Sequence, residues 1–175
     1  MDRFGFIYEK LDIKILILFI LRRLPGIVDA ETLRELSQCD EGVGYFDYSD
    51  CLAELVETNH VQEHDEGYSI TEKGARNAEA VESSLPYSVR TKALKLIKPV
   101  EEKLRRAAMI KASHRQDEKG GCMVELGLSD GQGEIMRLSF LCADEEQAKQ
   151  IEKNFRRDAE AYYQKVVELM TEKIK

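Results

Sequence analysis

The chain has 175 residues, of which 43% are apolar and 34% are charged, with a formal net charge of −7. This balance is that of a folded globular protein and excludes an intrinsically disordered chain. The length suffices for one or two small domains, each with an apolar core.

The strongest apolar run is ILILFIL at residues 15–21, with Arg22 and Arg23 directly after it. A membrane-spanning helix needs about 20 apolar residues, so this run is too short to cross a bilayer. Asp12 lies just before the run and no small-residue cleavage site follows it, which argues against a secretory signal. We therefore expect a cytoplasmic protein with no membrane partner.

The chain has four cysteines, which form no C-x-x-C pair: Cys39, Cys51, Cys122 and Cys142. In a cytoplasmic protein such cysteines are usually reduced thiols that pack as small apolar side chains. His60 and His64 are candidate zinc ligands together with Cys39 and Cys51. However, eleven residues intervene between these two cysteines, whereas zinc-binding cysteines usually lie two to four residues apart. We expect neither a metal site nor a cofactor.

The charges are segregated along the chain. Residues 29–83 contain 15 acidic and 3 basic residues, a net charge of −12. Residues 84–119 contain 10 basic and 4 acidic residues, a net charge of +6. This asymmetry says more about partners than the total charge does.

The first predicted helix runs from about Glu9 to Leu24 and is stopped by Pro25 and Gly26. Its middle, at residues 13–21, is apolar on every side, although a helix that covers one small core needs only an apolar stripe. The pattern therefore predicts that two surfaces bury this helix. The second surface is either the C-terminal half or another copy of the chain, which is a first indication of a homodimer.

Two shorter helices come next. Asp29 is placed to cap a helix that ends near Cys39, and Asp47 to cap a third helix within FDYSDCLAELVETNH, residues 46–60. Apolar spacings of three and four predict the buried face of the third helix, from Cys51, Leu52, Leu55 and Val56. The same stretch carries four acids and no lysine or arginine: Asp47, Asp50, Glu54 and Glu57.

A short hairpin follows the third helix. Residues 61–64 and 68–70 are predicted strands around an Asp-Glu-Gly turn, and Thr71 is placed to cap a fourth helix that continues to about Ser84. Three helices followed by a two-stranded wing are the order of a winged helix-turn-helix. We expect that fold for residues 1–83.

The stretch GYSITEKG, residues 67–74, resembles the wing-and-cap signature of bacterial winged-helix transcription regulators, in which an aromatic or aliphatic residue precedes T-x-x-G. From the apolar first helix to NFRRDAEAYYQKVVELM, the whole chain resembles an uncharacterised bacterial family of winged-helix proteins with a C-terminal α/β tail. The resemblance implies a regulator-like fold and no particular ligand or target.

SSLP at residues 83–86 marks a predicted boundary, after which residues 84–175 form a second domain. Its first helix is basic and should kink or break near Pro99, because proline lacks a backbone donor. Three strands follow, near residues 109–115, 122–128 and 135–142, and then a long last helix that opens with Asp144 and Gln147 as a capping pair. The predicted fold class is α+β: a winged helix-turn-helix, then a helix, a three-stranded antiparallel sheet and a long C-terminal helix.

The last helix carries an apolar stripe with a heptad-like period, formed by Ala148, Ile151, Phe155, Ala159, Tyr162, Val166 and Leu169. Packing on the sheet is the commoner use of such a stripe, and an intermolecular seam is the alternative. Both uses hold if the helix is long enough to overhang the sheet. We expect residues 84–175 to mediate homodimerisation or to sense a ligand.

No catalytic constellation is recognisable. The sequence has neither a G-x-S-x-G elbow nor a G-x-x-x-x-G-K-[ST] phosphate loop, and its three histidines leave few candidates for a general base. We therefore expect no enzyme.

A dimeric transcription regulator is the first hypothesis for the function. Base contacts would then come from Tyr48, Ser49, Asn59 and Gln62. Phosphate contacts would come from Arg22, Arg23, Arg34, Lys73 and Arg76, or from a basic patch at Arg90, Lys92, Lys95 and Lys98, for which a solvated helix face is the commoner explanation.

The alternative hypothesis is a protein-docking winged helix. Acids on the third helix and the wing repel phosphates by about 1 kcal/mol for each close pair in water, so DNA binding is disfavoured. A basic protein surface suits these acids better. A variant of this hypothesis is self-recognition, in which the acidic face meets the basic segment of another copy.

Overall fold

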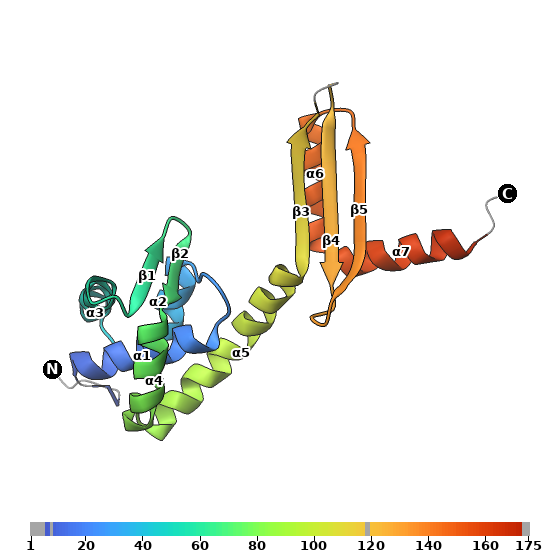
Figure 1. The fold of residues 1–175 in the computed structure, drawn as a ribbon. Helices are drawn as coiled ribbons and strands as arrows, with labels where there is room; N and C mark the ends of the chain where they lie inside the picture. Colours follow the sequence, from blue (N-terminus) through green and yellow to red (C-terminus); the bar gives the residue numbers. More distant parts are fainter. Residues whose placement is uncertain (1–5, 8, 118–119, 173–175) are drawn as a thin grey trace. The chain divides into compact units, whose positions relative to one another are not determined.

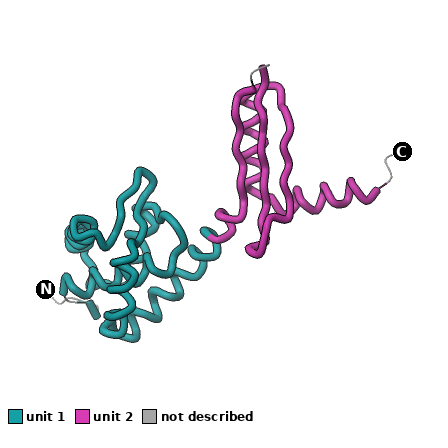
Figure 2. Tube along the Cα trace, in the orientation of Figure 1, with its two compact units in different colours: residues 1–104 teal, residues 105–175 magenta. Residues whose placement is uncertain are grey.

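The computed structural model describes residues 6–7, 9–117 and 120–172 (Figure 1). The chain divides into two compact units, which we name the N-terminal unit (Met1–Leu104) and the C-terminal unit (Arg105–Lys175) (Figure 2). The first combines helices with a two-stranded hairpin, and the second combines helices with a three-stranded antiparallel sheet. The α+β class is therefore confirmed.

Helix α1 (Lys10–Arg23) is buried on every side by its own chain, with Ile13 and all of residues 15–21 buried. Its neighbours include α2 (Ala30–Ser37), α3 (Tyr45–Glu57), α4 (Glu72–Val81) and the short helix η1 (Glu82–Ser84). The same core continues into α5 (Tyr87–Met109) through Val89, Ala93 and Ile97. Because one chain supplies both burying surfaces, the apolar character of α1 gives no reason to expect a second copy.

The caps of α2 and α3 differ. Asp29 caps α2, since its side chain accepts a hydrogen bond from the Thr32 N–H at 2.9 Å, which lowers the pKa of the carboxyl. Helix α3 begins at Tyr45 after Gly44, with no side-chain cap. The prediction that Asp47 caps α3 was wrong. Asp47 lies in the first turn, where its negative charge interacts favourably with the positive end of the helix dipole and stabilises the helix.

The predicted hairpin is present and pairs β1 (Val61–His64) with β2 (Gly67–Ile70) antiparallel, although Gly67, expected in the turn, belongs to β2 and pairs with His64. Val28 adds a bridge to Tyr68, with a 2.8 Å hydrogen bond in each direction. This bridge fixes the segment before α2 against the hairpin.

The T-x-x-G motif has a direct packing explanation. The Thr71 hydroxyl oxygen accepts from the Gly74 N–H at 3.0 Å, which caps α4, and donates to the Asn59 carbonyl at 2.8 Å. A Cβ at Gly74 would lie 2.1 Å from the His60 carbonyl oxygen. The motif therefore locks the start of α4 against the end of α3.

Helix α5 runs unbroken through Pro99, so the predicted break is absent. Proline removes the hydrogen bond to the carbonyl of Lys95, and both residues are exposed, so water can solvate that carbonyl. The sequence placed a domain boundary after residue 83, whereas the compact units divide between Leu104 and Arg105. The reason is that the first half of α5 packs in the same core as α1.

The C-terminal unit has the predicted sheet, in the order β3 (Ile110–Gln116), β4 (Cys122–Ser129) and β5 (Glu134–Cys142). Helix α6 (Glu145–Arg157) covers one face of it (Figure 1). The Asp144 and Gln147 side chains cap α6, accepting at 2.8 Å from the N–H groups of Gln147 and Ala143.

The predicted long last helix is two helices. Asp158 ends α6 and caps α7 (Ala159–Thr171), accepting a hydrogen bond from the Ala161 N–H at 3.3 Å. The first half of the apolar stripe packs on the sheet, with Ala148, Phe155 and Ala159 in the core. Beyond it, Tyr162 and Leu169 are exposed.

The substitution Gly74→Ala tests the packing of the T-x-x-G motif. Alanine normally stabilises a helix by about 1 kcal/mol relative to glycine. Here we expect destabilisation by about 3 kcal/mol, because the new methyl group would overlap the His60 carbonyl. The urea midpoint measures the change. Gly133→Ala, where a Cβ meets nothing within 4 Å, is the matched control and should leave the midpoint unchanged. A stabilised Gly74→Ala variant would contradict the packing explanation.

Candidate functional site

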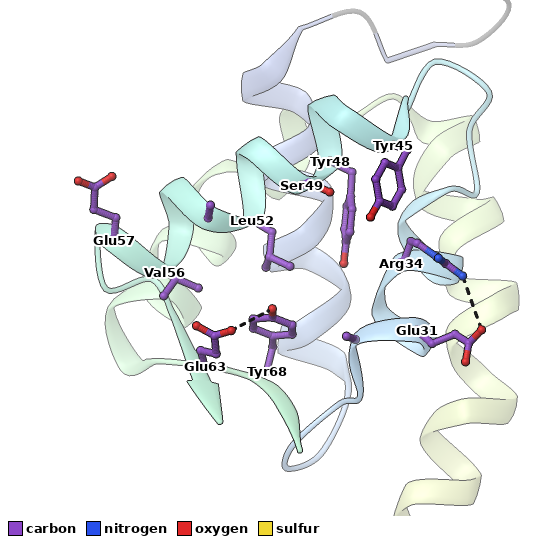
Figure 3. Close-up of a pocket in the computed structure, with 12 residues that line it drawn as sticks. Glu31, Arg34, Tyr45, Tyr48, Ser49, Leu52, Val56, Glu57, Glu63 and Tyr68 are labelled. Carbon is purple, nitrogen blue, oxygen red and sulfur yellow. Dashed lines mark hydrogen bonds and ion pairs between the residues drawn. The ribbon is translucent and has the colours of Figure 1, made fainter. Parts of the chain in front are cut away.

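An open groove of about 630 Å³ lies on the N-terminal unit between α2, α3 and the hairpin (Figure 3). Helix α3 forms its apolar wall with Leu52, Ala53 and Val56, while α2 and the hairpin form the other sides. The lining residues are Ala30, Glu31, Arg34, Tyr45, Tyr48, Ser49, Leu52, Ala53, Val56, Glu57, Glu63 and Tyr68. The groove therefore combines apolar, aromatic and acidic side chains.

The charged side chains that line the groove are mainly acidic. At the hairpin end, the Tyr68 hydroxyl donates to Oε1 of Glu63 at 3.3 Å, which leaves the second carboxylate oxygen of Glu63 available to a ligand. At the α2 end, Arg34 lies 3.6 Å from a carboxylate oxygen of Glu31 (Figure 3). Of the described lining residues, Arg34 alone is basic. The hairpin end therefore has acidic groups without a basic neighbour in the lining.

Tyr48 differs from the other groove tyrosines. Its side chain projects from α3 towards the space between Arg34 and Tyr68 (Figure 3), and the residue is only 4% exposed. Its hydroxyl is buried without a hydrogen-bond partner among the described residues, and burial raises the pKa of the phenol. Tyr48 is thus part of the groove wall, and its position does not suit a direct contact with DNA bases.

The acids of α3 divide into two groups. Asp50 forms an ion pair with Lys10 at 2.8 Å, and Glu54 forms one with Lys14, so α1 neutralises this side of α3. The hydrogen bond from Lys14 lowers the pKa of Glu54, and the hydrogen bond to Asp50 raises the pKa of Lys10. The structure gives Asp50 and Glu54 partners within the chain, whereas Glu57 lines the groove.

Each lysine and arginine between residues 9 and 84 has an acidic or carbonyl partner. Arg22 pairs with Glu79 and Glu82, and Arg23 pairs with Glu82. The remaining pairs are Lys10 with Asp50, Lys14 with Glu54, Arg34 with Glu31, Arg76 with Glu72, and Lys73 with the Thr58 carbonyl. The predicted phosphate contacts at Arg22, Arg23, Arg34, Lys73 and Arg76 are therefore already engaged.

The other predicted contact residues do not form one cluster. Ser49 lines the groove, whereas Asn59 and Gln62 are exposed and absent from its lining. Asn59 has a positive φ of 58° directly after α3, and its carbonyl accepts from Thr71, so it serves to end the helix. The sequence reasoning missed Tyr45, Ala53 and Tyr68. The recurrence of Tyr45, Ser49, Ala53 and Val56 at helical spacing was a signal for this face.

The predicted basic patch on α5 splits into different environments. Lys92 lies 3.8 Å from the buried carboxylate of Asp40, which also accepts hydrogen bonds from the N–H groups of Phe6, Ile7 and Gly42. Arg90 has a buried Nε atom. Lys95 and Lys98 are exposed and line a hollow of about 480 Å³ together with Arg23 and Arg90. Three of the four predicted basic residues therefore share this hollow, whereas Lys92 lies beside Asp40.

Other kinds of site have little support within the described residues. All four cysteines are free thiols, and no group of three or more potential metal ligands is found among residues 6–7, 9–117 and 120–172. None of the helices in this part of the chain is long and apolar enough to cross a membrane.

Comparison with known proteins gives one match. Residues 13–170 match the family described as a domain of unknown function, DUF4364. The chain belongs to this DUF4364 family. No curated protein and no solved structure matches it. The family match covers both units and includes most of α1, the groove and most of α7, so the groove and the C-terminal sheet are parts of one family domain.

The substitution Tyr48→Phe tests the state of the buried hydroxyl. A buried hydroxyl without a partner costs about 1–3 kcal/mol relative to its hydration in the unfolded chain. We expect Tyr48→Phe to raise the free energy of unfolding by about 1 kcal/mol, as measured by urea denaturation. Tyr45→Phe, at a ring that is 54% exposed, should have no effect. A loss of stability in Tyr48→Phe alone would mean that the hydroxyl makes a favourable interaction in solution.

Proposed function

We propose that the N-terminal unit is a winged helix-turn-helix and that this DUF4364 protein is a regulator-type protein that acts through it. The order of three helices, a hairpin and a further helix supports the proposal, as does the Val28 bridge, which adds a third, very short strand beside β2. The T-x-x-G packing at Gly74 supports it as well. The step from this fold to regulation is an analogy between folds.

We propose further that the contact face of this module binds a protein rather than DNA. The observation that carries the proposal is the engagement of every described base between residues 9 and 84, together with the acidic lining of the groove. Affinity for DNA comes largely from lysines and arginines that replace counterions at phosphates. Because the bases between residues 9 and 84 already have acidic or carbonyl partners, few of them are left for that task.

Exposed ion pairs are weak, so a DNA phosphate could replace the carboxylate as the partner of a lysine or arginine. Such a pair contributes about 0–1 kcal/mol, and a base can leave it at little cost. However, the carboxylate stays behind on the same surface. A phosphate that captures Lys14 would therefore lie close to Glu54, and the repulsion would offset much of the gain. Pair exchange alone does not make this surface favourable for DNA.

Binding to random-sequence duplex DNA tests the choice between protein and DNA. We expect no change in the anisotropy of a labelled duplex at about 50 mM salt. The acidic surface repels the DNA phosphates, and this repulsion prevents non-specific electrostatic binding. The double variant Glu57→Lys, Glu63→Lys reverses two groove charges and should gain salt-dependent binding. Tight, salt-dependent binding by the unmodified protein would instead support an operator-binding regulator.

We also propose that the protein is a homodimer held by the C-terminal unit. Helix α7 supports this proposal, because Leu169, the last residue of the apolar stripe, is 63% exposed and the next residue, Met170, is 81% exposed. Strand β5 is an edge strand of the sheet and exposes Phe140 and Leu141. A second copy offers the same two apolar surfaces, which a two-fold axis could bring into contact.

The double variant Leu169→Glu, Met170→Glu tests this dimer. Charges within an apolar interface are strongly unfavourable, so we expect sedimentation to show a dimer for the unmodified protein and a monomer for the variant. Gln164→Glu, at an exposed polar position of the same helix, is the control and should remain a dimer. A monomeric unmodified protein at all concentrations would exclude the proposed dimer.

A further inference from the structure

We propose that the hairpin end of the groove is a binding site for an arginine side chain carried by an apolar segment of a partner protein. This inference rests on the proposed function, because it names the chemistry of the protein partner. Its basis is the combination of Glu63, Tyr68 and the apolar wall of α3 at one end of the groove (Figure 3).

The charge of the site selects a cation. Glu63 and Glu57 line this end, and the nearest base of the lining, Arg34, belongs to α2 and pairs with Glu31. One oxygen of Glu63 accepts from the Tyr68 hydroxyl at 3.3 Å, so the other oxygen can accept from a ligand. A cationic donor would thus complete the hydrogen bonding of Glu63 and reduce the negative charge of the groove.

The shape of the site favours arginine over lysine. A guanidinium group is planar, stacks on aromatic rings and donates in a fork that matches a carboxylate. The rings of Tyr68 and Tyr45 border the groove at the hairpin and at the start of α3. A lysine ammonium is more strongly hydrated and lacks the planar fork, so it satisfies the same groups less completely.

The apolar wall indicates that the arginine belongs to a protein segment. Leu52, Ala53 and Val56 form a continuous surface along α3 that a free amino acid would leave largely uncovered. A segment with apolar side chains beside its arginine would cover that wall.

The test uses the full chain and a dye-labelled, capped peptide, Gly-Ser-Leu-Arg-Leu-Arg-Leu-Ser-Gly, with fluorescence anisotropy as the readout. We expect saturable binding that weakens about tenfold when citrulline replaces arginine, since citrulline keeps the shape and removes the charge. Replacement by lysine should weaken binding by a smaller factor. Equal binding of the citrulline peptide would overturn the proposal, as would the absence of binding by the arginine peptide.

Two variants locate the peptide on the protein. Glu63→Gln should weaken binding about tenfold, whereas Glu66→Gln removes the same charge from the exposed hairpin turn and should change it little. Equal losses in both variants would show a general attraction to an acidic surface and overturn the site. Both positions are exposed, and a thermal melt checks that each variant is folded.

Two further arms separate this inference from the proposed function. Capped single arginine should bind far more weakly than the peptide, and similar affinities would mean a small-molecule site in place of a protein-docking site. A labelled random duplex should not bind. Duplex binding that the peptide displaces would overturn the proposed protein-docking function, whereas failure of the peptide alone, with no duplex binding, would overturn only the arginine site.

Discussion

The burial of helix α1 is the constraint on which the rest of the N-terminal unit depends. Its middle is apolar around the full circumference, so α2, α3, α4 and the first half of α5 must all pack against or beside it to remove that surface from water. The groove exists because α3 and the hairpin are held at fixed positions by this shared core. The proposed contact face is thus a consequence of a helix that contributes nothing to its lining.

The same helix determines the electrostatics of the unit. The charged ends of α1 reach its neighbours: Lys10 and Lys14 pair with acids of α3, and Arg22 and Arg23 pair with Glu79 and Glu82 near the end of α4. Much of the acidity that the sequence concentrates in residues 29–83 therefore serves internal pairing. The acids that remain for a partner include Glu57 and Glu63 of the groove and Asp65 and Glu66 of the hairpin turn, so the available set is smaller than the net charge suggests.

Local signals in the sequence predicted the elements well, and failures occurred where packing decides. Asp29, Thr71 and the Asp144–Gln147 pair cap helices as predicted, because a cap depends on residues within one turn. Asp47 does not cap α3, and the last helix divides at Asp158. An aspartate is compatible with the N-cap and with other positions near the start of a helix, so its presence alone does not fix where the helix begins. For the candidate site, both Tyr48 and Ser49 were assigned to a contact face and both line the groove, but Tyr48 is buried in its wall. Neighbouring residues of a helix point about 100° apart, and only the packing of α3 fixed which of them was buried.

The sequence by itself determined the α+β class, the existence of the hairpin and of the three-stranded sheet, and the apolar character of α1, because these follow from periodicity and turn residues along the chain. Only the tertiary structure decided that one chain buries the apolar middle of α1, that Asp50 and Glu54 have lysine partners, and that Glu63 and Tyr68 share a groove with α3. The physical reason is distance along the chain. Lys10 and Asp50 are 40 residues apart, and no local pattern specifies a contact that only the folded core brings together.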